Sequence, residues 1–295
     1  MKICRFDDNR LGLVEPHPDA GHVLRDVTAA LDCLGTYGYP LPQFDPMIAN
    51  LDAVVARIRA LAPSAPMLPL AGRQLLAPVA NPSKILGAPV NYKKHLDEAR
   101  AQAEIHHNNQ VAEIQKIGLF LKANSSLVGP SEGVALQHAN RRNDHEAELV
   151  VVIGKAGRNI ARADALQYIA GYSSGLDMTT RGPEERSLRK SVDTYSVLGP
   201  WFVTADEIAD PGNIAFSLAV NGQIKQQANT RDLILSIGEL IEFASAFYTL
   251  HPGDLIYTGT PEGVGSVTAG DVIVTEFAGI GRMEVHVRMA RGAAL

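Results

Sequence analysis

The run of residues 149–153, Leu-Val-Val-Val-Ile, constrains the fold of this chain more than any other feature. Its β-branched residues, followed by Gly154, are typical of a buried strand. Glu146 and Glu148 lie just ahead of the run, and residues two apart in a strand point to the same face. Two adjacent carboxylates at the end of a core strand need a neutralising partner, and hard divalent cations prefer such oxygens. The pattern therefore predicts a metal site, with a solvated strand face as the alternative.

Composition excludes several classes of protein. The 295 residues carry a net charge of −5 and no long Lys/Arg block, so no nucleic-acid or anionic-membrane partner is expected. Cys4 and Cys33 are too few for a disulfide framework or a thiolate zinc site. No stretch of about 18 uncharged apolar residues is present, and acidic residues occupy the start of the chain where a signal peptide is apolar. These features predict a cytoplasmic protein.

The proline-rich stretch of residues 63–82 is the best candidate for a domain boundary. We expect a small N-terminal domain over residues 1–75 and a larger catalytic domain over residues 76–295. The smaller part carries a predicted strand pair within residues 1–14, turning at Asp8-Asn9-Arg10. Helical spacing of apolar residues predicts helices over 22–34 and 48–62.

Beyond residue 119 the pattern is dominated by short strands. The expected strands cover 149–153, 255–258, 271–277 and 283–288. A helix is predicted over 234–248, where apolar residues share one broad face. Few helices among many strands indicate a mixed or antiparallel β core of the α+β class.

A polar segment over residues 93–117 has helical composition and a thin apolar stripe. It is either a lid over a site or a solvated surface helix. His95 and Glu98 are three residues apart, so on a helix they share a face and can hydrogen-bond. A carboxylate on one imidazole nitrogen makes the other a better general base. The alternative is an exposed surface pair.

Three more polar residues are weaker candidates. Asp177 follows a Gly/Ser-rich stretch and is either a third oxygen ligand for the metal or a cap or turn residue. Lys190 is either a stabiliser of a developing oxyanion or a surface lysine. Thr260 lies in a glycine-containing loop after a strand, but the loop lacks the signatures of a nucleotide-binding site.

Taken in order, several motifs resemble the fumarylacetoacetate hydrolase superfamily over about residues 80–290. They are Asn91-Tyr92-x-x-His95-x-x-Glu98, Phe120-Leu121-Lys122 with Ser126-Leu127-Val128-Gly129-Pro130, Glu146-Ala147-Glu148 with its apolar run, Asp177, Lys190-Ser191-x-Asp193 with Leu198-Gly199-Pro200-Trp201, Val220-Asn221-Gly222, Asn229-Thr230-x-Asp232 and Thr258-Gly259-Thr260-Pro261-x-Gly263-Val264-Gly265.

The resemblance implies an α+β fold, with a mixed β-roll or β-sandwich C-terminal core, a small α/β N-terminal domain and a homodimer. It also implies that Mg²⁺ or Mn²⁺, or alternatively Ca²⁺, is bound by three carboxylates. The implied site residues are the metal ligands Glu146, Glu148 and Asp177, the catalytic residues His95, Glu98 and Lys190, and the substrate-binding residues Tyr92, Gly259, Thr260 and Arg181.

The chain also departs from the family pattern. Leu176 precedes Asp177 where many members have Asn, Gly182 follows Arg181 where many have Asp, and Arg189 precedes Lys190 where Gly is usual. The metal and acid–base groups are retained, so these differences bear on the choice of substrate.

The activity expected from this resemblance is metal-dependent hydrolysis of a C–C bond in an acylpyruvate or related β-diketo acid, in the catabolism of an aromatic compound. The fumarylacetoacetate-like and fumarylpyruvate-like acids are the model substrates. Isomerisation or decarboxylation of hydroxymuconate-like diacids, hydratase or lyase chemistry and oxaloacetate decarboxylation are alternatives on the same site. Retention of His95 and Glu98 favours hydrolysis, because isomerisation needs no activated water. A non-catalytic binding module is a further alternative.

Overall fold

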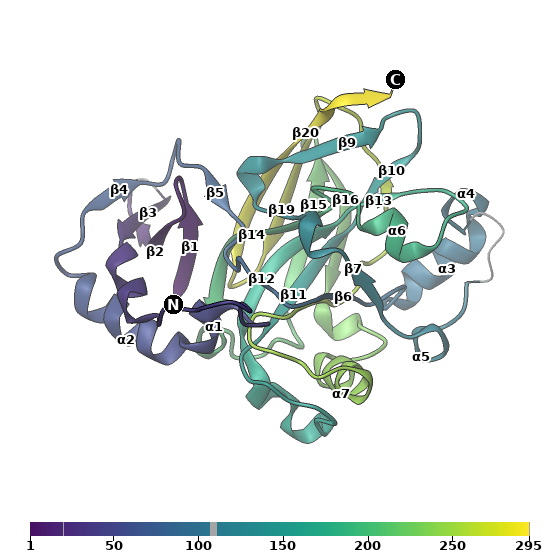
Figure 1. Ribbon diagram of the computed structural model, residues 1–295. Coiled ribbons are helices and arrows are strands. Elements are labelled where there is room, and N and C mark those ends of the chain that lie inside the picture. Colours follow the sequence, from purple (N-terminus) through teal and green to yellow (C-terminus); the bar gives the residue numbers. More distant parts are fainter. Residues whose placement is uncertain (20, 107–110, 295) are drawn as a thin grey trace.

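A computed structural model describes residues 1–19, 21–106 and 111–294 (Figure 1). The strands are β1 (Lys2–Phe6), β2 (Arg10–His17), β3 (Gly21–Asp26), β4 (Met67–Pro69), β5 (Leu75–Leu76), β6 (Ile85–Gly87), β7 (Phe120–Lys122), β8 (Leu127–Val128), β9 (Val134–His138), β10 (Asn143–His145), β11 (Ala147–Ile153), β12 (Ile169–Asp177), β13 (Thr179–Thr180), β14 (Ser196–Thr204), β15 (Ala215–Val220), β16 (Gln223–Asn229), β17 (Leu255–Tyr257), β18 (Gly265–Ser266), β19 (Val272–Phe277) and β20 (Gly281–Ala294). The α-helices are α1 (Pro46–Ala49), α2 (Leu51–Leu61), α3 (Lys93–Ala101), α4 (Ala103–His106), α5 (Ile114–Ile117), α6 (Arg186–Lys190) and α7 (Ile237–Phe247).

The largest sheet has twelve strands, and β11 lies within it between β12 and β17. All seven residues of β11 are buried, which confirms the buried strand predicted over 149–153. Alternate side chains of this strand enter different parts of the core. Val150 and Val152 join a cluster with α1 and α2, whereas Val151 and Ile153 join one with α7 and the five-stranded sheet. The strand therefore anchors both halves of the interior.

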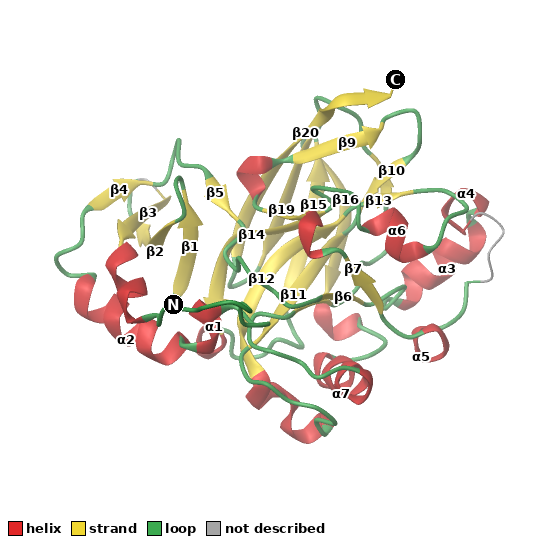
Figure 2. Cartoon of the chain, in the orientation of Figure 1, coloured by secondary structure: helices red, strands yellow, loops and turns green. Residues whose placement is uncertain are grey.

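Two smaller sheets complete the β core. One has the order β13-β10-β18, and the other has the order β16-β15-β19-β20-β9. Figure 2 shows strands through the centre of the molecule, with α3, α4 and α5 grouped on one side of them and α2 on the opposite side. The strands expected over 255–258, 271–277 and 283–288 are confirmed as β17, β19 and part of β20.

The N-terminal part of the chain extends the large sheet. Strands β1 and β2 form the expected antiparallel pair, and β1 also pairs with β14. The helix predicted over 22–34 is wrong in its first half. Residues 21–26 form β3, which pairs in register with β2 and buries Val23 and Leu24, and only Thr28–Cys33 forms a 3₁₀ helix. Pairing with a neighbouring strand has overridden the helical spacing. The division at residue 75 stays a prediction.

The other two helices predicted outside residues 93–117 are confirmed. Helices α1 and α2 occupy the range 48–62, with the first beginning slightly earlier. Helix α7 confirms the prediction over 234–248, and a capping box between Ser236 and Glu239 fixes its start. Within residues 1–19, 21–106 and 111–294, no helix is long and apolar enough to cross a membrane.

The segment 93–117 is not one long helix. It contains α3, α4 and α5, and four of its residues, 107–110, lie outside the described residues. The first helix ends at Gln102, whose backbone is extended, and Gly118 ends the last helix with a positive φ of 70°. His95, Leu96 and Ile114 are buried, so the segment packs against the core through a broader apolar face than the sequence indicates.

Candidate metal centre and active-site cavity

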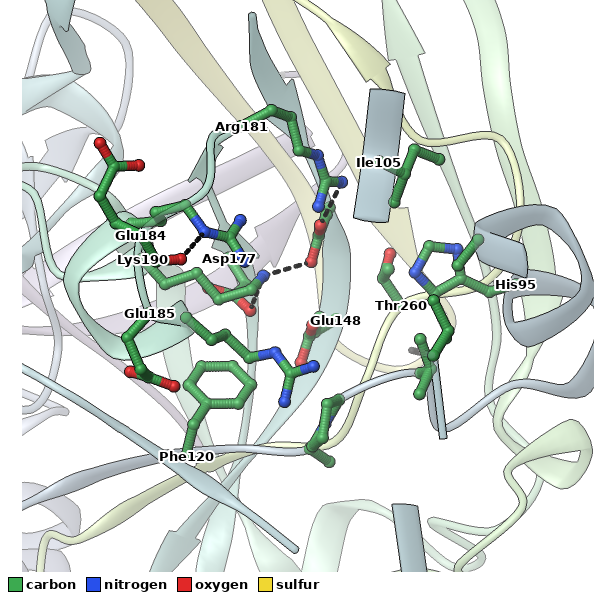
Figure 3. A pocket seen from close by; sticks show the side chains of 18 of the residues that line it. His95, Ile105, Phe120, Glu148, Asp177, Arg181, Glu184, Glu185, Lys190 and Thr260 are labelled. Carbon is green, nitrogen blue, oxygen red and sulfur yellow. Dashed lines mark hydrogen bonds and ion pairs between the residues drawn. The ribbon is translucent and has the colours of Figure 1, made fainter. Parts of the chain in front are cut away.

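A cavity of about 460 Å³ lies between the end of β11 and the helices α3, α4 and α6. Figure 3 shows His95 on the side of this cavity opposite Lys190, with Glu148 and Thr260 between them. The residues that line it are Ala88, Pro89, Val90, His95, Ala99, Ile105, Val111, Phe120, Glu146, Glu148, Asp177, Arg181, Pro183, Glu184, Glu185, Arg186, Arg189, Lys190 and Thr260. Seven of the ten predicted site residues therefore line one cavity, and Glu98, Gly259 and Tyr92 are not among the described residues that line it.

Two adjacent strands bring three carboxylates together. Glu148 lies on β11 opposite Gly175 of β12, and the backbone N–H of Asp177 donates to the carbonyl of Glu146 at 2.9 Å. One oxygen from each of Glu146, Glu148 and Asp177 lies within 4.8 Å of the others, and all three side chains are buried. The strand ladder therefore holds a three-carboxylate cluster rigidly at the base of the cavity.

Lys190 and Arg181 partly neutralise this cluster. The ammonium of Lys190 donates to Glu146 and Asp177, each at 2.7 Å, and Arg181 donates to Glu146 at 2.9 Å. Burial alone would raise the pKa of Glu146, but Lys190 and Arg181 outweigh it and hold that pKa below its ordinary value. Glu146 is therefore a carboxylate at neutral pH.

Glu148 is in the opposite situation. Burial and the neighbouring Asp177 carboxylate raise its pKa well above the ordinary value. Its side chain accepts a hydrogen bond from the Gly259 N–H at 2.7 Å, but no lysine or arginine of the described chain forms an ion pair with it. A buried carboxylate beside another, with oxygens of three acidic side chains converging, fits a divalent cation, which would supply the missing positive charge.

Lys122 is a buried neighbour of the carboxylate cluster, and no role was predicted for it from the sequence. It lies on β7, its ammonium is a close hydrogen-bond donor to Asp177, and it donates to the Tyr195 carbonyl at 2.8 Å. Burial lowers its pKa, and the Asp177 carboxylate opposes that effect. The sequence signal was the Phe120-Leu121-Lys122 motif, but nothing in it indicated that the lysine reaches Asp177.

Asp144 is a second residue that the sequence analysis missed. It is fully buried two residues before Glu146, and its carboxylate accepts from Arg181 and Arg142, each at 2.8 Å. The alternation of Asp144, Glu146 and Glu148 was a usable signal, because residues two apart share a strand face. Arg181 therefore joins Asp144 to Glu146 at the cavity wall.

His95 and Glu98 form the hydrogen bond expected from their spacing on α3. His95 Nδ1 lies 2.9 Å from one oxygen of Glu98, and the other oxygen accepts the Gly263 N–H at 3.0 Å. In the neutral tautomer that donates to this carboxylate the ring proton is on Nδ1, which leaves Nε2 as an acceptor on a side chain that lines the cavity. One oxygen of Glu98 thus orients the ring of His95, and the other ties Glu98 to the backbone at Gly263.

The remaining predicted substrate-binding residues differ from one another. Thr260 lines the cavity, donates to the Ala147 carbonyl at 3.0 Å and accepts from Gln226 at 2.8 Å. The Gly259 amide is committed to Glu148, so it positions a carboxylate of the cluster. Tyr92 is buried, packs its ring edge-on against Phe216, and is not among the described residues that line the cavity. We therefore assign substrate contact to neither Gly259 nor Tyr92.

Comparison with known proteins identifies the family. The model of the fumarylacetoacetate (FAA) hydrolase C-terminal domain matches residues 84–288, more than half of the chain. The chain belongs to the fumarylacetoacetate hydrolase family. This confirms the resemblance drawn from the ordered motifs.

Relatives of this family member extend along nearly its whole length. The maleylpyruvate hydrolase of Aquipseudomonas alcaligenes is 58% identical over 292 residues, covering 98% of this chain and 99% of that protein. The crystal structure of maleylpyruvate hydrolase from Sphingobium sp. SYK-6, in complex with manganese(II) and pyruvate, has a TM-score of 0.81 and 39% identity, covering 98% of this chain and all of that one.

A third family member has a different activity. The 5-carboxymethyl-2-hydroxymuconate delta-isomerase of Mycobacterium smegmatis matches with a TM-score of 0.70 and 29% identity, covering 98% of this chain and 100% of that chain. The family fold, a β-rich C-terminal core with a small N-terminal part, is therefore confirmed, and the fold serves both hydrolases and isomerases.

Proposed function

We propose that this protein is a divalent-metal-dependent hydrolase that cleaves a C–C bond of an acylpyruvate, with maleylpyruvate and fumarylpyruvate as model substrates, in the catabolism of an aromatic compound. One observation carries the proposal: a three-carboxylate cluster and an oriented histidine line the same cavity. The high similarity to a maleylpyruvate hydrolase over nearly the whole chain supports it.

The metal would be held by Glu146, Glu148 and Asp177. Three carboxylates suit Mn²⁺ or Mg²⁺, with Ca²⁺ as a further candidate, and the manganese in the Sphingobium enzyme favours Mn²⁺. When bound, such an ion would polarise a carbonyl of a 2-oxo acid held in the cavity.

His95 would activate the water. Its free Nε2 takes a proton from a water molecule as the oxygen attacks the acyl carbonyl, and Glu98 on Nδ1 stabilises the resulting imidazolium. The bond between the acyl carbon and C3 of the pyruvate moiety then breaks. The acyl part leaves as a carboxylic acid, and the electron pair remains on the pyruvate part as an enolate.

Lys190 would stabilise that enolate. Its ammonium is buried at the carboxylate cluster, where a positive charge acts strongly on developing negative charge. Protonation of the enolate carbon gives pyruvate, so one water and one acylpyruvate become one carboxylic acid and one pyruvate. Arg181 and the Thr260 hydroxyl line the same cavity and would orient the keto acid.

Isomerase, tautomerase or decarboxylase chemistry is the competing proposal, since a related fold carries an isomerase. The His95–Glu98 pair favours hydrolysis, because those reactions need no activated water. A homodimer and a cytoplasmic location are further predictions of ours, to be tested by light scattering and cell fractionation.

The test is turnover of a panel containing maleylpyruvate, fumarylpyruvate, acetylpyruvate and oxaloacetate, with Mn²⁺ or Mg²⁺ and with EDTA. We expect metal-dependent release of pyruvate plus a carboxylic acid, identified by mass. Release of CO₂ from oxaloacetate, or isomerisation of the diacids without cleavage, would move the assignment to decarboxylase or isomerase chemistry. Inactivity on every substrate, with no thermal stabilisation by metal, would favour a binding module.

A further inference from the structure

The segment 181–190 brings three arginines to the cavity, and they are used differently. Arg181 forms ion pairs with Asp144 and Glu146. Arg186 and Arg189 also line the cavity, but neither has a carboxylate within ion-pair distance among the described residues. Two of the guanidinium groups that line the cavity are therefore not ion-paired within the described residues.

The acids next to these two arginines have other partners. Glu184 forms a two-pronged pair with Arg141, with distances of 2.7 and 3.1 Å. Glu185 caps α6 by accepting the Ser187 N–H at 2.6 Å. Neither Glu184 nor Glu185 is therefore ion-paired with the guanidinium of Arg186, a residue that lines the cavity.

Arg186 and Arg189 differ in how they are held. Arg189 Nε donates to the Glu184 carbonyl at 2.8 Å, which fixes that guanidinium against the backbone. The guanidinium of Arg186 makes no hydrogen bond within the described part of the chain, and it lies 5.8 Å from the centre of the Phe120 ring. Its donors are therefore available to a ligand, whereas Arg189 already uses two donors, the second to the Thr180 carbonyl at 3.5 Å.

Arg186 is also close to the carboxylate cluster. The ammonium of Lys190 lies 5.3 Å from the centre of the same Phe120 ring and touches both Glu146 and Asp177. A single aromatic ring thus contacts the cation at the cluster and the free guanidinium. A ligand that extends from the cluster along this ring reaches Arg186.

A partly buried guanidinium without a hydrogen-bond partner is costly unless an anion binds to it. Burial lowers the pKa of Arg186, and the carboxylates of Glu185, Glu146 and Asp177 oppose that effect. Arginine presents a planar pair of donors that matches a carboxylate in two-point geometry. The position therefore suits an anionic group at the far end of an elongated ligand.

We infer that Arg186 is the specificity residue that binds the distal carboxylate of a dicarboxylic acylpyruvate, with Phe120 packing against the carbon chain between the two ends. This inference rests on the proposed function and narrows it. The preferred substrate has a second carboxylate at the end of its acyl group, and an acylpyruvate with a plain alkyl end lacks the group that Arg186 recognises.

The test compares kcat/KM for maleylpyruvate, fumarylpyruvate and acetylpyruvate, the last having no distal carboxylate. The enzymes are the unsubstituted protein, Arg186→Gln, Arg186→Lys and the matched variant Arg189→Gln. We expect Arg186→Gln to lower kcat/KM for each diacid, relative to kcat/KM for acetylpyruvate, by about 10- to 100-fold. The change should appear as a higher KM for the diacids, because a charge-assisted hydrogen bond to their distal carboxylate is lost. Arg186→Lys should recover part of the ratio, and Arg189→Gln should change it less than about threefold.

Two results would overturn the inference: an unchanged ratio in Arg186→Gln, or an equal loss on all substrates. A larger fall in Arg189→Gln would move the role to that residue and also contradict it. Failure of the unsubstituted enzyme to cleave any acylpyruvate would instead contradict the proposed function, so the two failures are distinguishable.

Discussion

The two walls of the cavity are built in different ways. One wall is the end of β11 and β12, where Glu148 and Asp177 are fixed by the hydrogen-bonded ladder of a fully buried strand pair. The other consists of short helices on two sides of the cavity, where His95 on α3 and Arg186 on α6 are held by a few side-chain contacts. The strand wall gathers negative charge, and the helical wall carries the proposed base and the proposed specificity residue.

This difference suggests a division of labour. A metal site needs several oxygens fixed relative to one another, which a strand ladder provides. The end of the substrate that varies between relatives is better recognised by residues on short, separately anchored helices. The sequence of such helices can change without disturbing the sheet. The predictions below test whether the two walls are separable, from the largest expected effect to the smallest.

Glu148→Ala should abolish function through the strand wall. Loss of one of three buried oxygens removes metal binding, and loss of metal polarisation should lower kcat by at least about a thousandfold. Metal binding is measured by calorimetry and turnover by pyruvate release. Full activity with undiminished metal affinity would show that the cluster is not the metal centre.

His95→Asn should separate the walls. We expect normal metal affinity but a fall in kcat of about 10²- to 10⁴-fold, because general-base catalysis is lost while the carboxylates are untouched. The same calorimetric and kinetic assays measure both quantities. Retention of full turnover would remove the water-activating role and put isomerase or decarboxylase chemistry first.

Lys122→Met should weaken the strand wall itself. The substitution leaves the Asp177 carboxylate buried without this cation, so the free energy of unfolding in EDTA should fall by about 3–5 kcal/mol. Lys116→Met, which removes an exposed pair with Glu113, is the control and should cost about 1 kcal/mol or less. Urea denaturation with and without Mn²⁺ measures both, and equal small losses would show that Lys122 does not support the cluster.

Glu98→Gln should give the smallest change. The amide oxygen can still accept from His95, but the charge that stabilises the imidazolium is gone, so kcat should fall by about 10- to 100-fold, the range typical of such supporting residues. KM and metal affinity should stay near their original values, as measured by steady-state kinetics and calorimetry. A change in metal affinity would mean that the helical wall supports the cluster after all.

Much of the strand wall was predictable from the sequence. The β-branched run after Glu146 and Glu148 indicates a buried strand with both acids on one face, and the structure shows that arrangement. The His95–Glu98 hydrogen bond also followed from helical spacing. These features depend on residues close in sequence, whose geometry is set by local periodicity.

The remaining features depend on long-range pairing. Lys122 reaches Asp177 because β7 pairs with β6 and β6 with β17 beside β11, an order that no local pattern encodes. The helix expected over 22–34 failed for the same reason, since β3 exists through its pairing with β2. Arg186 resembles an ordinary surface arginine until the fold places it in the cavity.

The measurement that tests the central claim most directly is a single turnover of maleylpyruvate in H₂¹⁸O, with Mn²⁺ and with EDTA. The account predicts metal-dependent cleavage that places one ¹⁸O in the carboxyl group newly formed on the released acid, with pyruvate as the other product. Recovery of an uncleaved isomer or of CO₂, with no ¹⁸O in a new carboxylate, would contradict hydrolysis at this site.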